Sequence, residues 1–482
     1  MAPTREPDTP PAWARWALVA ITVAAAALRL PGLTAEEPWF DEAFSIVLAS
    51  QDPGELWRRA LADQTNPPGF YLLLWGWTRL GGFGLAWMRL LPTLCAVATV
   101  PVVAMAARAV RRDWTAAVAA AAFAAVSPLL LAMSSELRAY APVALAMALV
   151  LLAAAHGRRA LTAVGLVAVV MLHYFGAFAA FAVAAGLLRA SRGLMGDRLR
   201  TAVLTVLPAA IALGAWLLAV VAAGGNRPFA ANAEWIRPRY LQDLVSFASQ
   251  VVGTFGTPLG GLAVLALLLV ALGVALRETL PGPRDPLAAD PEAVPGARLG
   301  APLRLVVVSA YLPLLLVPFA GTLTGRPLWV ARYLIITLPA WWILLGSLVA
   351  RAPQRWRTAV LVGSLGWAVL TGVLAEAARP RRTRWSAIAR AMTAGGPRAI
   401  CVNEDYVALP LRYQAVTQQL PLTVLDLGAC RPERGPDAIL IRPGTERALE
   451  GLRREGVRIG LARDLGTTLP ETALHALEWP LR

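Results

Sequence analysis

Long apolar runs separated by short polar connections fill the chain from its start to about residue 378. The first run, Trp16 to Leu30, follows Arg5 and Arg15. It has no convincing small-residue cleavage site before Pro31, which favours a retained first helix over a signal peptide. Further apolar runs lie at 90–107, 115–133, 140–155, 160–173, 175–189, 201–222, 251–276, 304–320, 331–350 and 358–375. Since about 20 apolar residues cross about 30 Å of hydrocarbon, the pattern predicts about eleven transmembrane helices.

The pattern changes after residue 378, where charge rises and the long apolar runs end. Short strand-like pieces at 399–402, 422–427 and 438–441 alternate with helix-like pieces at 385–393 and 445–455. We therefore predict two domains, a transmembrane module at 1–378 and a small α/β domain at 379–482. Cys401 and Cys430 fall in the second domain, where an oxidising compartment would permit a disulfide between them; two buried free thiols are the alternative.

The composition supports a polytopic α-helical membrane protein. The 482 residues are 57% hydrophobic and only 16% charged, which excludes an ordinary soluble protein and a disordered one. Three cysteines in the whole chain exclude a disulfide-rich scaffold.

The formal net charge of +15 is the excess of 45 basic residues, all of which are arginine, over 30 acidic ones. No basic block alternates with aromatic residues as a nucleic-acid groove requires, so we predict no nucleic-acid partner. The arginines gather instead in alternate connections between the apolar runs, at 108–112, 158–159, 189–200, 277–298 and 351–357. By the positive-inside rule these connections and the N terminus are cytoplasmic. An odd number of spans in the cytoplasmic (inner) membrane then leaves the C-terminal domain extracytoplasmic.

The densest group of polar residues beside a predicted span is the segment Glu36 to Glu42, just after the first apolar run. It carries four carboxylates within seven residues. Acids at a low-dielectric boundary are costly unless they have a task or a partner, and such a boundary suits a general base. A solvated acidic loop is the alternative.

A second polar motif, Asp63 to Tyr71, leads into a stretch rich in tryptophan. Pro67 and Pro68 can start a helix but cannot lie inside one. The segment from Pro68 to Leu80 is too short to cross the bilayer. We therefore expect a helix along the outer membrane face, within a first outer loop at 32–89.

Several short motifs, spread over nearly the whole chain, carry a resemblance to a known family. They are Asp41-Glu42, Asn66-Pro67-Pro68-Gly69-Phe70-Tyr71-Leu72-Leu73-Leu74, Met88-Arg89-Leu90-Leu91-Pro92, Ser134-Ser135-Glu136-Leu137-Arg138-Ala139-Tyr140, His173-Tyr174-Phe175 and Arg332-Tyr333-Leu334. With these motifs and an outer C-terminal domain, the chain resembles the membrane glycosyltransferases of the GT-C fold. Within that fold it is most similar to bacterial members of the dolichyl-phosphate-mannose-protein mannosyltransferase and aminoarabinose transferase type, a glycosyltransferase family 39-like group.

The resemblance implies an inverting transfer of a hexosyl or pentosyl group from a polyprenyl-phosphate donor. The acceptor would be a glycan, lipid or protein of the cell envelope, on the outer face of the membrane. The family's acidic residue, which takes the proton from the acceptor hydroxyl, maps onto Asp41, with Glu42 beside it. Neighbouring side chains point about 100° apart on a helix, so only one of them can face the acceptor. We expect Asp41 to be the base and assign Glu42 to orientation, an arginine pairing or a metal.

Such a transfer needs positive charge for the leaving phosphate but no general acid. Arg138 and Arg332 are the candidates, because arginine binds phosphate bidentately and each lies at the expected outer end of a span, close to Tyr140 or Tyr333. Snorkelling towards lipid headgroups is the alternative for both arginines, and a salt bridge between Glu136 and Arg138 competes with phosphate binding.

Four further residues are candidate substrate contacts. His173 and Tyr174 lie between two spans at the outer face, where a hydrogen-bonded interfacial histidine is the alternative. Trp39, next to the acidic pair, could stack on a sugar, although aromatic belts explain most boundary tryptophans. Asn66 is the first residue of the proline-containing motif.

We predict no resident cofactor or metal. No set of His, Cys and Asp residues has metal-ligand spacing. Some relatives within the wider GT-C fold use a divalent cation, so Asp41 with Glu42 could still bind one.

Two other functions stay open, a transporter or flippase of lipid-linked sugar or polysaccharide and an O-antigen-type polymerase or ligase. A transporter should carry polar groups and broken helices near the bilayer midplane, whereas the polar clusters here lie at span ends. A polymerase or ligase should carry a large catalytic loop late in the chain, whereas the acidic motif here comes first. Neither the sugar nor the acceptor follows from the sequence.

Overall fold

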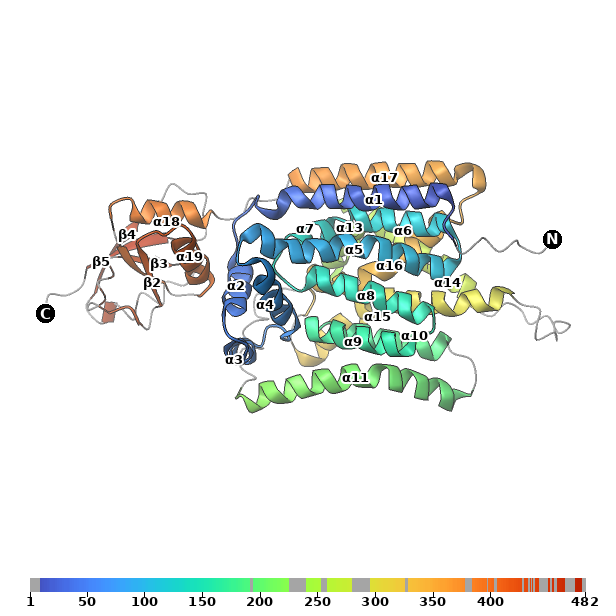
Figure 1. Cartoon of the computed structure of the whole chain (residues 1–482), viewed down its shortest axis with the longest axis horizontal. Coiled ribbons are helices and arrows are strands. Elements are labelled where there is room, and N and C mark those ends of the chain that lie inside the picture. The colour runs from blue at the N-terminus through green and yellow to red at the C-terminus, as the bar shows by residue number, and fades with distance from the viewer. Residues whose placement is uncertain are drawn as a thin grey trace. The chain divides into compact units, whose positions relative to one another are not determined.

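The computed structural model of the chain divides it into two compact units. The helical unit is Met1–Leu33 with Leu48–Arg379, and the C-terminal unit is Thr34–Val47 with Pro380–Arg482 (Figure 1). The short segment Thr34–Val47, which contains the predicted catalytic acids, therefore groups with the end of the chain. The structure describes residues 9–190, 194–224, 240–252, 258–279, 295–325, 328–377, 384–396, 398–402, 405–426, 429–431, 434, 436, 438–441, 450, 453–454, 457–463 and 473–478.

Helices form nearly all of the described part of the helical unit. They are α1 (Ala12–Arg29), η1 (Leu30–Leu33), α3 (Pro53–Asp63), α4 (Gly69–Gly81), α5 (Leu85–Arg111), α6 (Trp114–Val126), α7 (Pro128–Ser134), α8 (Tyr140–Ala155), α9 (Arg159–Leu172), α10 (Gly176–Ala190), α11 (Met195–Ala222), α13 (Tyr240–Val252), α14 (Pro258–Thr279), α15 (Pro295–Thr324), η2 (Ala331–Thr337), α16 (Leu338–Val349) and α17 (Gln354–Ala377). α2 (Phe40–Ser50) begins in the C-terminal unit and ends in the helical unit. Every apolar run of the sequence coincides with one helix or with two consecutive ones.

Five of these segments are long and apolar enough to cross a membrane, namely α1 with η1, α5, α11, most of α15, and η2 with α16. The pair α6 and α7, bent by 54°, raises the count to six, and α8, α9, α10 and α14 supply shorter apolar helices, all within the described residues. The chain is therefore a multi-pass membrane protein. The figure of about eleven spans stays a prediction.

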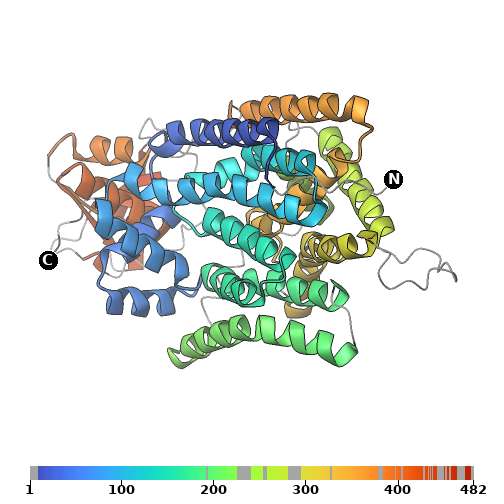
Figure 2. The ribbon, with the colours of Figure 1, turned by 45° about the vertical axis from the view of Figure 1, so that its right-hand side comes forward.

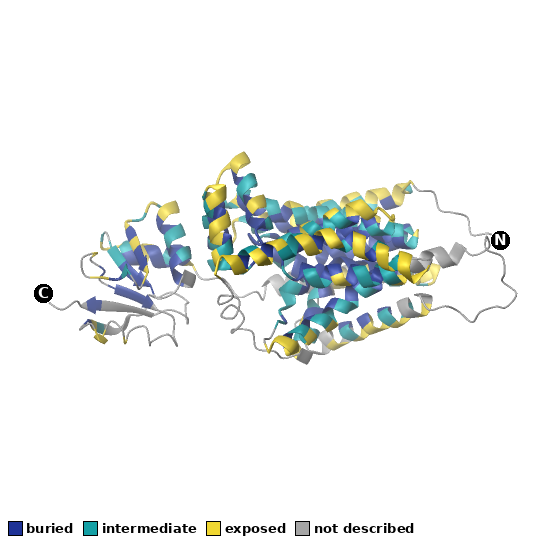
Figure 3. Cartoon of the chain, turned by 90° about the horizontal axis from the view of Figure 1, so that it is seen from below, coloured by how far each residue is buried: buried dark blue, intermediate teal, exposed yellow. Residues whose placement is uncertain are grey.

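Burial differs sharply between central and peripheral helices. In the most apolar window of η2 with α16, 83% of the residues are buried, against 11% for α1 with η1 and 22% for α11. A Cβ atom at Gly346 of α16 would lie 2.4 Å from the carbonyl oxygen of Ala116, so α16 packs directly on the backbone of α6. α11 lies at the edge of the helices in two views (Figures 1 and 2), and buried residues fill the interior of the helical unit (Figure 3).

The helical unit has two chemically different ends. α8 runs from Tyr140 to the connection that contains Arg158, and α9 returns from there to His173. Among the described residues, the arginine-containing connections at 108–112, 158–159 and 351–357 lie at one end, which we call the arginine-rich end (Figure 1). The starts of α8 and α10 and the end of α9 lie at the opposite end, which we call the site end (Figure 1).

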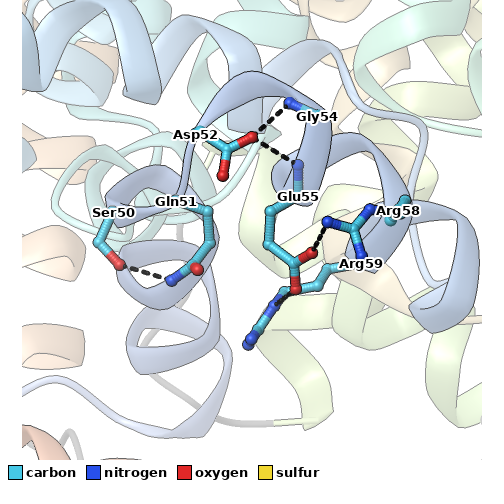
Figure 4. A network of polar contacts seen from close by, with 7 residues as sticks. All are labelled: Ser50, Gln51, Asp52, Gly54, Glu55, Arg58 and Arg59. Carbon is cyan, nitrogen blue, oxygen red and sulfur yellow. Dashed lines mark hydrogen bonds and ion pairs between the residues drawn. The ribbon is translucent and has the colours of Figure 1, made fainter.

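Polar residues define the start of α3 at the site end. Asp52 precedes the helix, and its Oδ1 accepts the backbone N–H groups of Gly54 and Glu55, both at 3.0 Å (Figure 4). The hydrogen bond from the backbone N–H of Glu55 is the largest cause of a lowered pKa at Asp52, and the bond from Gly54 acts in the same direction. Glu55 pairs with Arg58 and Arg59, each at 2.6 Å, on an exposed surface where such pairs add at most about 1 kcal/mol.

The C-terminal unit contains, among its described residues, a five-stranded sheet in the order β2-β1-β3-β5-β4. The strands are β1 (Arg398–Val402), β2 (Leu422–Asp426), β3 (Ala438–Ile441), β4 (Arg458–Arg463) and β5 (Ala473–Glu478), with α18 (Trp385–Thr393) and α19 (Asp405–Thr417). β1 is parallel to β2 and β3, whereas β5 is antiparallel to β3 and β4. The predicted small α/β domain is confirmed. Of the expected helix at 445–455, residues 450 and 453–454 are described and helical, and the rest lie outside the described residues.

Successive residues of β1 enter two different cores, as the alternation of a strand requires. Ile400 packs with residues of α18 and α19 such as Ile388 and Leu411. Cys401 belongs to the second core and forms a disulfide with Cys430, with their Cα atoms 5.7 Å apart. Of the two alternatives left open by the sequence, the structure therefore has the disulfide.

Candidate active site

The predicted catalytic acids lie in the first turn of α2. Trp39, which is half-buried, precedes this helix, and its carbonyl accepts the backbone N–H of Ala43 at 2.9 Å. Glu42 is fully buried, whereas Asp41 is partly exposed. The two carboxylates therefore differ in accessibility, as expected of neighbours on a helix, and Asp41 is the one that a solute can reach. The partial positive charge of the helix N-terminus stabilises both.

A third acid of the same segment, Glu37, binds the C-terminal domain. Its Oε2 accepts the backbone N–H of Ser386 at 2.8 Å and the side-chain amide of Gln414 at 3.2 Å. Its Oε1 accepts the Ser386 hydroxyl. In the sequence Glu37 is one acid among four, and no local pattern marks it as different from its neighbours.

The point where the chain leaves the helical unit is also defined. Arg89, which is 1% exposed, donates from Nη1 to the carbonyl of Leu33 at 3.1 Å. Arg89 belongs to one of the motifs that carry the family resemblance, and Leu33 is the last residue of η1. This hydrogen bond joins the start of α5 to the residue directly before the segment Thr34–Val47.

An aromatic cluster at the site end joins four residues from distant parts of the sequence. Tyr140 starts α8, His173 and Phe175 lie between α9 and α10, and Tyr333 lies in η2. The ring of Tyr333 lies 5.1 Å from that of His173, 5.0 Å from that of Phe175 and 6.3 Å from that of Tyr140. Tyr140 also lies 5.9 Å from His173. Three of these residues were predicted as substrate contacts, and the fold brings them together.

Two arginines add positive charge to this cluster. The Arg332 guanidinium lies 5.6 Å from the centre of the Tyr333 ring, and Arg138 is buried at 8% exposure. Burial, followed by the charges of Arg138 and Arg332, lowers the pKa of His173 to about 3. Both predicted phosphate ligands therefore act on the same imidazole, which is neutral at pH 7.

The tautomer of His173 follows from its backbone contact. Its Nδ1 accepts the backbone N–H of Phe175 at 3.2 Å. In the neutral ring the proton is then on Nε2, which is a hydrogen-bond donor. His173 can therefore donate a hydrogen bond to an anion without carrying a charge of its own.

Close packing between α4 and α9 places Tyr71 beside this cluster. A Cβ atom at Gly69 would lie 2.4 Å from the carbonyl oxygen of Met171, so only glycine permits the start of α4 to contact the last turn of α9. Tyr71 follows in the same turn, is 1% exposed and accepts a hydrogen bond from Nη1 of Arg138 at 3.4 Å. Tyr71 belongs to one of the motifs that carry the family resemblance, but it was not among the predicted site residues.

Tyr174 takes part in a neighbouring polar group. Its hydroxyl accepts the indole N–H of Trp216 at 2.8 Å, and Trp57 of α3 contacts the Trp216 ring edge-on at 5.2 Å. Burial raises the pKa of Tyr174 to about 12, with a smaller contribution from the negative charge of Asp63. His173 and Tyr174 are thus adjacent in sequence but have different partners, and Asp63 and Trp216 were not predicted.

The remaining predicted contacts are buried near the same elements. Asn66, at 8% exposure, lies between α3 and α4, and Glu136, at 4%, lies between α7 and α8. The Glu136 carbonyl accepts the backbone N–H of Arg138 at 2.7 Å. Within the described residues, no group of three or more His, Cys, Asp or Glu side chains could hold a metal ion.

No family model and no curated protein sequence matches this chain. Solved structures do match it along almost its whole length. ArnT from Cupriavidus metallidurans in the apo state has a TM-score of 0.56 at 16% identity, over 97% of this chain and 98% of that one. The same protein bound to undecaprenyl phosphate has a TM-score of 0.55 at 15% identity, over 96% and 98%. A weaker likeness, with a TM-score of 0.47 at 13% identity over 89% and 69%, is to the archaeal oligosaccharyltransferase AglB from Archaeoglobus fulgidus. The expected GT-C fold is confirmed.

Proposed function

We propose that this chain, a multi-pass membrane protein of the GT-C fold, is an inverting glycosyltransferase that takes its sugar from a polyprenyl-phosphate donor. The observation that carries the proposal is the clustering of two arginines with buried aromatic residues at the site end. Arg332 lies 5.6 Å from the ring of Tyr333, which lies 5.1 Å from His173. Arg138 is buried and donates to the hydroxyl of Tyr71. The guanidinium charges of the buried Arg138 and the partly exposed Arg332 give this cluster a positive potential that suits a phosphate group. The structure of ArnT with undecaprenyl phosphate, which has the same fold, supports a lipid phosphate as the ligand.

In the proposed reaction the acceptor hydroxyl oxygen attacks the anomeric carbon as the bond from that carbon to the phosphate oxygen breaks. Asp41, the accessible acid of α2, takes the hydroxyl proton. The polyprenyl phosphate leaves as an anion, and Arg138 and Arg332 stabilise its charge while His173 donates a hydrogen bond from Nε2. No general acid is needed, because a phosphate is a good leaving group.

Burial favours this role for Arg138 over snorkelling. A snorkelling arginine extends towards water and headgroups, whereas Arg138 is 8% exposed and donates to the hydroxyl of Tyr71. The ring contacts of Tyr140 and Tyr333 with His173 form an apolar wall around the charged groups, which strengthens their interaction with an anion.

We place the protein in the cytoplasmic membrane with its site end and its C-terminal domain outside. The arginines of the alternate connections support this orientation, because they gather at the end of the helical unit opposite to Tyr140 and His173. The transferred group is a hexosyl or pentosyl residue, and the acceptor is a glycan, lipid or protein of the cell envelope.

Binding of undecaprenyl phosphate to the purified chain tests the donor assignment directly. Arg138→Ala and Arg332→Ala should each weaken binding about 10- to 100-fold, since a hydrogen bond to a charged group contributes about 1.5–3 kcal/mol. Arg79→Ala is the matched control, because Arg79 is an exposed arginine of α4 that lies 5.0 Å from the Trp75 ring. Affinities of both test variants equal to that of the control would overturn the phosphate assignment.

A further inference from the structure

One carboxylate joins the acidic segment to the C-terminal sheet domain. Glu37 binds the backbone N–H and the hydroxyl of Ser386, in the first turn of α18, and the amide of Gln414 in α19. Ser386 and Gln414 are separated from Glu37 by 349 and 377 positions in the sequence. Both are buried, at 5% and 4% exposure. The partly buried Glu37 carboxylate therefore bonds to groups that are shielded from solvent.

The same contact completes the N-terminus of α18. The residue before this helix, Arg384, provides no side-chain cap. Glu37 supplies the missing acceptor for the first turn, where a carboxylate also interacts favourably with the helix dipole. The cap of a helix in the C-terminal domain therefore comes from the segment that carries Asp41.

We propose that the C-terminal domain positions the catalytic acid, with Glu37 as the positioning residue. This inference rests on the proposed role of Asp41. Contacts group Thr34–Val47 with Pro380–Arg482 as one compact unit, so Asp41 and the first turn of α2 belong to the same unit as the sheet domain. The C-terminal domain is on this account a part of the catalytic apparatus.

The test compares Glu37→Ala and Glu37→Gln in the full chain with Glu55→Gln. Glu55 is a matched control, since it is a partly exposed acid of α3 that pairs with Arg58 and Arg59 of the same helix (Figure 4). The assay follows the transfer of a radiolabelled sugar from a lipid-phosphate donor, either undecaprenyl-phosphate mannose or undecaprenyl-phosphate arabinofuranose. It gives kcat and the KM for the donor. Because a misplacement of about 1 Å can cost about 100-fold in rate, Glu37→Ala should lower kcat about 10- to 100-fold and leave the donor KM within about twofold.

Two further measurements make the outcome decisive. The rate of backbone hydrogen exchange at residues 34–47 should rise in Glu37→Ala, while the rate in α3 stays unchanged. This measurement does not depend on which sugar the enzyme transfers. Ser386→Ala, which removes only a hydroxyl, should lower kcat less, and its effect should not add to that of Glu37→Ala. An unchanged kcat in Glu37→Ala, or a fall in kcat matched by an equal rise in KM, would overturn the inference.

The failure of this inference can be told apart from the failure of the proposed function. If Asp41→Asn transfers sugar at the wild-type rate, the base assignment fails and Glu37 has no catalytic acid to position. If Asp41→Asn is inactive but Glu37→Ala is fully active, only the positioning role fails.

A different observation carries a second, independent inference at the arginine-rich end. A cavity of about 500 Å³ opens there between α9 and α11. Its polar lining includes Arg159, Asp197, Arg200 and Thr201, and its apolar lining includes Ala163 and Leu204. The volume is in the usual range for a small-molecule site.

The charge of this cavity favours an anion. α9 and α11 run parallel, because α10 returns between them, so both N-termini lie at this end. Neither N-terminus has a side-chain hydrogen-bond cap, and the dipoles of both helices add to the charges of Arg159 and Arg200. Together they outweigh the single carboxylate of Asp197.

We infer that this cavity binds the headgroup of an anionic phospholipid. The phosphate would lie between Arg159 and Arg200, and the acyl chains would follow the exposed apolar side of α11, where Leu204 is 57% exposed and Ile211 is 61% exposed. Basic cavities between membrane helices on the cytoplasmic side are suited to such lipids.

The experiment measures the melting temperature of the purified full chain in nanodiscs of phosphatidylcholine with and without phosphatidylglycerol. Phosphatidylglycerol should raise the melting temperature of the wild type by about 2–4 °C, and this rise should vanish in the double variant Arg159→Ala/Arg200→Ala. Arg355→Ala is the matched control, since Arg355 is an exposed arginine at the same end in α17. A rise in the double variant equal to that in the control, or no rise in the wild type, would overturn the inference.

Discussion

Replacing Gly69 with alanine should separate α4 from α9 and thereby weaken donor binding. The new Cβ atom would lie 2.4 Å from the carbonyl oxygen of Met171, whereas ordinary contact begins at 3.4 Å. The obstacle is backbone in the last turn of α9, so no side-chain rotation relieves it. α4 must therefore move by about 1 Å, at a cost of about 1–3 kcal/mol for an overpacked site.

A movement of α4 also moves Tyr71, which lies in the same turn. The hydroxyl of Tyr71 is already 3.4 Å from Nη1 of Arg138. A displacement of about 1 Å breaks this hydrogen bond, because donor and acceptor then lie well beyond bonding distance. We expect Gly69→Ala to lower the thermal stability of the chain and to weaken undecaprenyl phosphate binding about tenfold, through the loss of one hydrogen bond to a charged group.

Gly76 provides the control within the same helix. A Cβ atom at Gly76 would meet nothing within 4 Å, so Gly76→Ala should leave donor binding unchanged. Its stability should rise by up to about 1 kcal/mol, because alanine favours a helix more than glycine does. The assay is a melting curve and a lipid-phosphate titration on both variants. Gly69→Ala behaving like Gly76→Ala would refute the proposed contact between α4 and α9.

Three other predictions concern protonation, the disulfide and metal ions. Folding lowers the pKa of His173 from 6.5 to about 3, so its stabilising contribution is complete above pH 6.5 and is lost as the pH falls towards 3. Melting temperatures should therefore fall more steeply on acidification for the wild type than for His173→Asn, and equal slopes would count against a neutral buried ring. Replacing Cys401 and Cys430 with serine should lower the stability of the C-terminal domain by about 2–4 kcal/mol in urea denaturation and leave lipid-phosphate binding intact. EDTA should leave the rate of sugar transfer unchanged; a loss restored by Mg²⁺ or Mn²⁺ would mean that Asp41 and Glu42 bind a cation.

The helices were predictable from the sequence because a membrane span needs an uninterrupted apolar stretch. The run at 140–155 coincides with α8, and 160–173 lies within one residue of α9 at each end. The run at 251–276 was less informative, since its first two residues end α13, residues 258–276 belong to α14, and residues 253–257 lie outside the described residues. Apolarity alone does not distinguish one bent span from two short helices. In the C-terminal unit, α19, β4 and β5 were missed, because short half-buried elements leave a weak pattern.

The candidate site was predictable where a motif named its residues. Arg138, Tyr140, His173 and Tyr333 came from the family resemblance, and the fold gathers them at the site end. The hydrophobic periodicity of the sequence could not have predicted that these residues meet. It indicates which face of its own helix a residue occupies, but not which residue of another helix it contacts. The contact of Glu37 with Ser386 was missed for the same reason.

The measurement that tests the central claim most directly is the rate of sugar transfer in membranes that contain the Asp41→Asn variant. Membranes containing the wild type, Asp41→Asn or Glu55→Gln would receive radiolabelled undecaprenyl-phosphate sugars, and label in cell-envelope glycans, lipids and proteins would be counted. The variant must be shown to insert at the wild-type level. We predict transfer by the wild type and by Glu55→Gln, and a loss of about 100-fold or more in Asp41→Asn, as expected on removal of a general base. Undiminished transfer by Asp41→Asn would contradict the account.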